Sequence, residues 1–189
     1  MPAATGHLAV AWIGQDPTGV ELGRVCGRLE QTFLTEVRLA ALRDRPLDAF
    51  DARRGQYEST RILQWLAPRV PTGARSLLAV TDQDLCIVVL TYVFGEAQVG
   101  GPAAVVSTAR LQTGLEGEPV DAERYQARLV KECVHEIGHT FGLTHCRTHG
   151  CVMGRANTIH DVDAKSDDLC RDCRAVLTAR QVKEAANAP

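Results

Sequence analysis

Three histidines and one glutamate in the second half of the chain have the types and spacing of a zinc-binding site. His135, Glu136 and His139 are followed by Gly142 and then by His145. Two histidines four residues apart lie on one face of a helix, one turn apart, so both imidazoles can reach the same ion. Zinc held by three protein nitrogens keeps a position open for water. The pattern therefore predicts a zinc centre that could carry out hydrolysis.

The third histidine requires a reversal of the chain, because a helix that continued straight would point His145 away from the ion. A glycine can adopt positive φ, so we expect Gly142 to let the chain turn back. From the composition, the complete pattern would arise by chance in about 3 × 10⁻⁵ of such chains. The alternative is that His135 and His139 are two ordinary helix histidines that face solvent or the core and bind no metal. By residue type His149 is an alternative third ligand, but its spacing lacks the glycine turn.

A cluster of four cysteines begins at the next residue. Cys146 and Cys151 form a C-x₄-C pair, and Cys170 and Cys173 form a C-x₂-C pair. Two pairs of thiolates are the composition of a closed structural zinc site. Disulfides or free buried thiols are the alternatives, which a reducing compartment and the odd total of seven cysteines disfavour. Because Cys146 follows the third histidine directly, we expect the cysteine site to anchor the loop that presents it.

The other three cysteines, Cys26, Cys86 and Cys133, lie in apolar stretches. Cysteine without a polar or metal-binding neighbourhood behaves as a small hydrophobic side chain. We therefore expect all three to be buried and none to act as a nucleophile.

Length and charge exclude several classes of protein. The chain has 189 residues and a net charge of −2, which suits one domain and lacks the basic excess of a nucleic-acid-binding protein. No stretch approaches the roughly 20 apolar residues of a membrane span. No Lys or Arg precedes the first apolar run, so a secretory signal is not expected. These features predict a cytoplasmic protein without nucleic-acid or membrane partners, and they indicate no particular oligomeric state.

Alternating strands and helices are expected before the histidine motif. Apolar runs and β-branched residues predict strands, and apolar residues at helical spacing predict helices. The expected strands are 8–13, 36–39, 77–80, 87–94 and 103–108, and the expected helices are 20–33 and 57–66. We expect a turn at 16–19 and a loop at 43–56, where Pro and Gly interrupt the pattern.

A long helix is expected to carry the motif itself. From Asp121 onward, apolar residues recur every four positions. Asp121 is a suitable N-cap, and Gly142 is a suitable residue just beyond the C-terminal end. A last short helix is expected over 174–186.

The two clusters together resemble the archaemetzincins, a family of metzincin-type zinc metallopeptidases. The resemblance is carried by HEIGHTFGLTHCRTHGCVM at 135–153 and by the C-x-x-C pair at 170–173. It implies an α/β (α+β) fold: a twisted, mostly parallel sheet with flanking helices, an active-site helix and a small Cys-rich zinc-binding C-terminal subdomain. We expect a single metallopeptidase domain over 1–189, with an N-terminal subdomain at 1–142 and a C-terminal one at 143–189.

The resemblance also implies roles for individual residues. His135, His139 and His145 would bind a catalytic zinc, Glu136 would be the general base, and the four clustered cysteines would bind a second, structural zinc. Met153 matches the family's methionine, which resembles the Met-turn methionine beneath the metal in other metzincins, with an ordinary buried methionine as the alternative. An antiparallel edge strand beside the cleft would pair with substrate, and 90–97 is the best candidate by order, although ordinary sheet pairing is also possible.

The predicted function is hydrolysis of peptide bonds in a peptide or protein substrate. Zinc lowers the pKa of its water from about 15.7 toward 7, and Glu136 would take the proton of that water and deliver it to the leaving amine. One alternative is a zinc-stabilised peptide-binding module with little or no turnover. Others are a zinc-ribbon interaction or nucleic-acid protein that uses only the cysteine site, and a zinc hydrolase that acts on other bonds.

Overall fold

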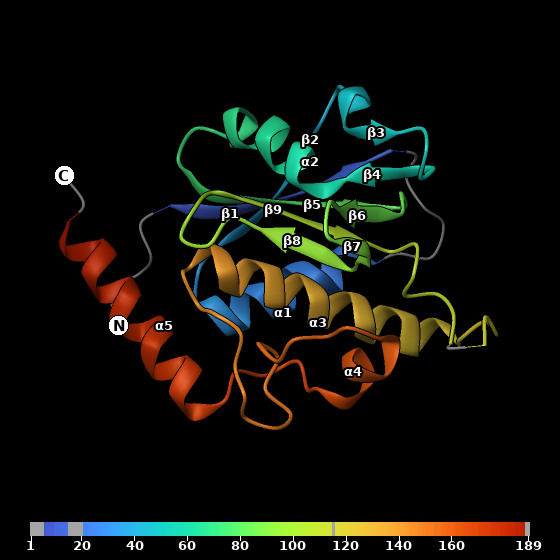
Figure 1. The fold of residues 1–189 in the computed structure, drawn as a ribbon. Helices are drawn as coiled ribbons and strands as arrows, with labels where there is room; N and C mark the ends of the chain where they lie inside the picture. Colours follow the sequence, from blue (N-terminus) through green and yellow to red (C-terminus); the bar gives the residue numbers. More distant parts are fainter. Residues whose placement is uncertain (1–5, 15–20, 115, 188–189) are drawn as a thin grey trace.

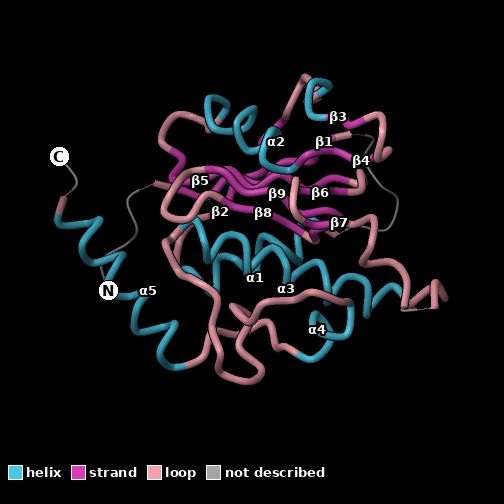
Figure 2. The backbone as a smooth tube through the Cα atoms, viewed as in Figure 1, coloured by secondary structure: helices cyan, strands magenta, loops and turns pink. Residues whose placement is uncertain are grey.

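A central five-stranded sheet with helices on both faces forms the body of the protein (Figures 1 and 2). The computed structural model describes residues 6–14, 21–114 and 116–187. Across the sheet the strand order is β2-β1-β5-β9-β8, and only β8, at one edge, runs antiparallel to its neighbour. The bounds are β1 (His7–Ile13), β2 (Val37–Ala41), β5 (Ala74–Thr81), β8 (Gly95–Ala97) and β9 (Ala103–Ser107). The expected mixed α/β fold with a mostly parallel sheet is confirmed.

Helices cover the two faces of this sheet because its inner strands are apolar on both sides. On β5, Leu78 and Leu77 point into separate cores, as expected for a parallel strand buried on both faces. Helices α1 (Leu22–Phe33) and α3 (Ala122–Thr140) pack on the first face, and α2 (Ser59–Leu66) with the short 3₁₀ turn η2 (Ala67–Arg69) lies on the second. The turn predicted at 16–19 and the predicted helix start at residue 20 lie outside the described residues.

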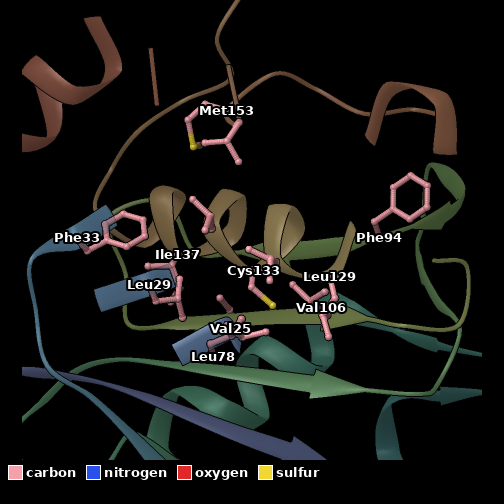
Figure 3. Close-up of a cluster of buried hydrophobic side chains, with 14 of the residues drawn as sticks. Val25, Leu29, Phe33, Leu78, Phe94, Val106, Leu129, Cys133, Ile137 and Met153 are labelled. Carbon is pink, nitrogen blue, oxygen red and sulfur yellow. The ribbon is translucent and has the colours of Figure 1, made fainter. Parts of the chain in front are cut away.

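Helix α3 carries the histidine motif across the first face of the sheet. Its N-cap is Asp121, whose carboxylate accepts the backbone N–H of Arg124 at 2.8 Å. The buried stripe that includes Leu129, Cys133 and Ile137 faces α1 and the sheet (Figure 3). The long helix expected from Asp121 is therefore confirmed.

A second, smaller sheet contradicts one sequence prediction. Its order is β3-β4-β6-β7, with β3 (Phe50–Asp51), β4 (Gln56–Glu58), β6 (Leu85–Ile87) and β7 (Leu90–Val93). The single strand predicted at 87–94 is wrong, because the chain there forms a β6–β7 hairpin and enters the central sheet only at β8. The prediction failed because Val88 and Val89, although apolar, form the tip of the hairpin and are each 81% exposed. The predicted loop 43–56 likewise contains β3 and the 3₁₀ turn η1 (Leu47–Ala49).

Beyond α3 the chain leaves the sheet and continues through loops to α4 (Ile159–Ala164) and α5 (Arg171–Ala186), the latter beginning three residues before its predicted start (Figure 1). Arg75 on β5 fastens this part to the body: it donates to Glu184 at 2.6 Å and to Thr140 O at 3.1 Å, and lies over the ring of Phe141. The C-terminal end of α3 is thus held by the sheet and α5 together. None of the described helices has the length and apolarity needed to cross a membrane.

Candidate metal centre

Helix α3 and the turn after it bring the three predicted histidines together. One ring nitrogen from each of His135, His139 and His145 lies within 4.8 Å of the others. The first two stand one turn apart on α3 with perpendicular rings, and both are buried. The third ring lies 5.3 and 5.0 Å from them, measured between centroids, and is exposed at the rim of the cleft.

The turn that returns His145 depends on Gly142. This residue has φ of +82°, and its N–H donates to His139 O at 2.7 Å. Leu143 N–H donates to Gly138 O at 3.0 Å, so two carbonyls at the helix end are satisfied. The predicted reversal at Gly142 is confirmed. The alternative ligand His149 is exposed and lies outside the three-histidine cluster.

The hydrogen bonds of the two helix histidines show that the site fits a metal ion. Nδ1 of His135 lies 2.8 Å from Val152 O, and Nδ1 of His139 lies 2.8 Å from Leu143 O. Carbonyl oxygens only accept, so each Nδ1 carries a hydrogen and each neutral ring keeps a lone pair on Nε2. The two Nε2 atoms are 3.1 Å apart. Two lone pairs at this distance repel each other unless a cation lies between them.

Burial also keeps these rings neutral, which a metal ligand requires. Burial lowers the pKa of His135 well below the usual value for histidine, and it lowers that of His139 as well. It lowers the pKa of His145 to about 4, with additional effects from His139 and Arg155. The three imidazoles are therefore unprotonated near neutral pH.

Glu136 borders the same cleft. Its side chain is nearly buried, and among the described residues Oε2 has no hydrogen-bond partner. Burial raises the pKa of this carboxyl well above its usual value, and the nearby Glu132 raises it further. The cleft has a volume of about 310 Å³ and is lined by Glu136, the three histidines, Thr144 and edge residues 95–97 and 99. Titratable groups with strongly perturbed pKa values in a cleft are typical of functional sites.

Strand β8 forms one wall of this cleft. Ser107 N–H donates to Phe94 O at 2.8 Å, and Gln98 N–H donates to Ala103 O at 2.9 Å. Because hydrogen-bonded pairs alternate in an antiparallel ladder, Gly95 and Ala97 direct their N–H and C=O groups away from β9. The prediction of an antiparallel edge strand at the cleft is confirmed for 95–97. It is wrong for 90–93, which belong to the smaller sheet.

The four clustered cysteines form a second group with metal-site geometry. Sγ of Cys146 lies 3.8 Å from Sγ of Cys170, and Sγ of Cys151 lies 3.8 Å from Sγ of Cys173. A tetrahedron with Zn–S bonds of about 2.3 Å has S···S edges of about 3.8 Å. The arrangement therefore fits a four-thiolate zinc site and not disulfides, whose sulfurs lie about 2.05 Å apart.

The three remaining cysteines lie apart from this group. Cys86 and Cys133 are buried as predicted. The prediction is wrong for Cys26, which is half-buried because it stands at the border of the buried stripe of α1.

The two clusters share one stretch of backbone. Cys151 precedes Val152, whose carbonyl binds the ring of His135. Cys146 N–H donates to Met153 O at 2.9 Å, directly after His145. Met153 is fully buried, and a Cβ at Gly138 would lie 2.5 Å from its Sδ, so its sulfur packs on α3 at Gly138. Figure 3 shows Met153 and Leu78 on opposite sides of α3.

Several groups of the site were not found from the sequence. The carbonyls of Val152 and Leu143 leave no signal in a sequence, because every residue has one. The buried ion pair between Glu132 and Lys165, 2.8 Å apart, joins α3 to the residue after α4 and is equally hidden. Gly95 offered a signal that was not used: a glycine inside a strand pattern often marks a close approach of backbone.

Comparisons with known proteins agree with this geometry. Residues 29–179 match the family described as peptidase family M54. An archaemetzincin from Archaeoglobus fulgidus is 43% identical over 79% of this chain and 86% of its own length. The crystal structure of an archaemetzincin from Methanopyrus kandleri is similar with a TM-score of 0.80 and 35% identity, covering 95% of this chain and 96% of that one. A zinc-dependent peptidase from Methanocorpusculum labreanum is similar with a TM-score of 0.78 and 30% identity, covering 90% and 99%.

Proposed function

The chain belongs to the archaemetzincins, peptidase family M54, and is a zinc metallopeptidase; on this premise we propose which of its residues bind zinc and cleave the peptide bond. Membership of a peptidase family implies peptide substrates. The observation that carries the residue assignment is the pair of Nε2 atoms on His135 and His139. They lie 3.1 Å apart beside the nearly buried Glu136, and the carbonyls bound at the two Nδ1 atoms leave a lone pair on each Nε2.

His135, His139 and His145 hold the catalytic zinc, each through one ring nitrogen. When bound, zinc supplies a Lewis acid that lowers the pKa of water to about 7 and polarises the scissile carbonyl. The carbonyls of Val152 and Leu143 fix the two helix rings so that Nε2 faces the ion.

Glu136 is the general base. Its Oε2 has no hydrogen-bond partner among the described residues, so its lone pairs are available to accept a proton from the attacking water. The raised pKa of the buried carboxyl lets it hold that proton and then release it to the leaving amine. An extended peptide pairs with the outward N–H and C=O groups of Gly95 and Ala97, which places its backbone beside Glu136.

Cys146, Cys151, Cys170 and Cys173 hold a second, structural zinc, giving two ions per chain. The sheet and α3, residues 1–142, form one subdomain, and 143–189 form the zinc-stabilised second one. Met153 packs against α3 at Gly138, on the side of the helix opposite the sheet residue Leu78. A reducing compartment preserves four thiolates, and the enzyme therefore acts in the cytoplasm.

The experiment that tests the assignment combines metal counting with peptide digestion. Zinc per chain is measured by mass spectrometry for the wild type and for the Glu136→Gln variant, and a peptide library is digested with and without a chelator. We expect two zinc ions in both proteins and cleavage only by the wild type, with a loss of several orders of magnitude in the variant. Full activity in the variant would remove Glu136 from the reaction. A fully zinc-loaded wild type that binds peptides without cutting them would favour the peptide-binding module.

A further inference from the structure

The position of Glu136 is set by packing and not by a hydrogen bond to its buried oxygen. Among the residues that the structure describes, no donor reaches Oε2, although this atom is buried. A glutamate side chain has several rotatable bonds, so its carboxyl group stays in one place only if neighbouring atoms leave it no alternative. The neighbours of Glu136 on the cleft side therefore decide where the base stands.

The residue that meets Glu136 there is Gly95, at the start of β8. A Cβ at Gly95 would lie 2.7 Å from Glu136 Oε1 and 2.8 Å from Glu136 Cγ. The glutamate thus occupies the space that the side chain of any other residue would need. The φ angle of Gly95 is not positive, so its backbone conformation does not require glycine. Space, and not conformation, is the reason for a glycine at this position.

Strand β8 has little freedom to yield. The same Cβ would lie 2.8 Å from the Val105 carbonyl of β9. The Glu96 carboxylate accepts hydrogen bonds from Ser59 Oγ at 2.5 Å and from Thr60 Oγ1 at 3.0 Å, which ties β8 to the start of α2. A methyl group at residue 95 would be wedged between a paired strand and the side chain of Glu136. The side chain is the softer of the two and would move.

We propose that Gly95 is a positioning residue for Glu136: its missing side chain is the space in which the catalytic carboxyl group stands, at the strand edge that pairs with substrate. The proposal rests on the proposed role of Glu136 as general base. It assigns the glycine a function at the reaction centre through Glu136, in addition to its place in the edge strand.

The first test is the Gly95→Ala variant, with Gly27→Ala as the matched control, because a Cβ at Gly27 on α1 meets no atom within 4 Å. Displacing a catalytic group by about 1 Å lowers the rate by on the order of 100-fold. We therefore expect kcat of Gly95→Ala to fall by about this factor with KM changed far less, two zinc ions retained, and an unchanged control. Wild-type kcat in Gly95→Ala would overturn the proposal. If Glu136→Gln were also fully active, the role of Glu136 itself would fail.

The second test uses thermal stability and does not depend on activity. The midpoint of unfolding, Tm, is measured for Gly95→Ala, Glu136→Ala and the double variant, all with excess zinc. If the added methyl collides with Glu136, Gly95→Ala should lower Tm clearly in the wild-type background and much less in the Glu136→Ala background. This comparison remains informative if Gly95→Ala folds poorly, because the double variant should then recover. An equal loss of Tm in both backgrounds would assign the collision to the Val105 carbonyl and overturn the proposal.

Discussion

The buried ion pair between Glu132 and Lys165, beside the metal centre, should make the fold sensitive to the loss of either partner. Glu132 stands on α3 one turn before Glu136, and Lys165 follows α4. Nζ lies 2.8 Å from Oε1, and the two side chains are only 5% and 3% exposed. Lys165 Nζ also lies 3.4 Å from Gly154 O, next to the segment that holds His135. The pair therefore joins the active-site helix to the C-terminal subdomain.

Removing one partner leaves the other as an uncompensated buried charge. Such a change lowers the free energy of unfolding by about 3–5 kcal/mol. For a chain of this size each kcal/mol shifts Tm by about 2–4 °C, so Glu132→Gln or Lys165→Met should lower Tm by roughly 6–20 °C. Replacing both by apolar residues of similar volume, Glu132→Leu with Lys165→Met, should restore most of the loss, because no charge remains buried.

Thermal unfolding measures Tm and urea unfolding measures the free energy of unfolding, both with excess zinc, since metal binding itself stabilises the folded state. The matched control is Glu123→Gln, which breaks the ion pair of the same helix with Arg24, where the side chains are 73% and 43% exposed. That change should alter the free energy of unfolding far less than Glu132→Gln does, because water screens an exposed pair. Two results would refute the reasoning: a similarly small effect for Glu132→Gln, or a double variant as unstable as the single ones.

Two further variants test the electrostatics and the coupling between the clusters. Arg128 holds the pKa of Asp163 well below its usual value, so the ionised pair stabilises the fold above the unfolded pKa of about 3.9 and this contribution is lost as pH falls through the folded pKa. Asp163→Asn should thus lower the free energy of unfolding by about 3 kcal/mol at pH 7. The difference in unfolding free energy between wild type and variant should become smaller in acid, and a difference that stays constant would contradict this. Cys170→Ala should remove one zinc and weaken binding of the other by about 10- to 100-fold, whereas Cys26→Ala should change neither. Zinc titration measures both, and unaltered affinity in Cys170→Ala would disprove the coupling.

Patterns of nearby residues were sufficient to predict the elements that carry the site. The four-residue repeat and the Asp121 cap predicted α3, because helix formation depends on contacts within a few positions. Gly142 predicted the reversal for a similar reason: a positive φ is a property of one residue. The fold class was implied by the family resemblance, and the structure confirms its mostly parallel sheet.

The hairpin of β6 and β7 shows where such patterns fail. The sequence shows that Val88 and Val89 are apolar, but it does not show that they stand at the exposed tip of a hairpin. Whether an apolar run continues as one strand or turns back depends on which strands lie beside it. The neighbour of β6 is β4, where Tyr57 pairs with Leu85 from 28 positions later in the chain.

The sequence by itself determined which side chains could bind zinc and which glutamate stands beside them, because ligand type and helical spacing are local properties. Only the tertiary structure decided what holds them in place: the Val152 carbonyl on the ring of His135, the space at Gly95 filled by Glu136, and the buried partner of Glu132. Each of these contacts joins residues between 17 and 41 positions apart, and such pairs meet only when the whole chain has folded.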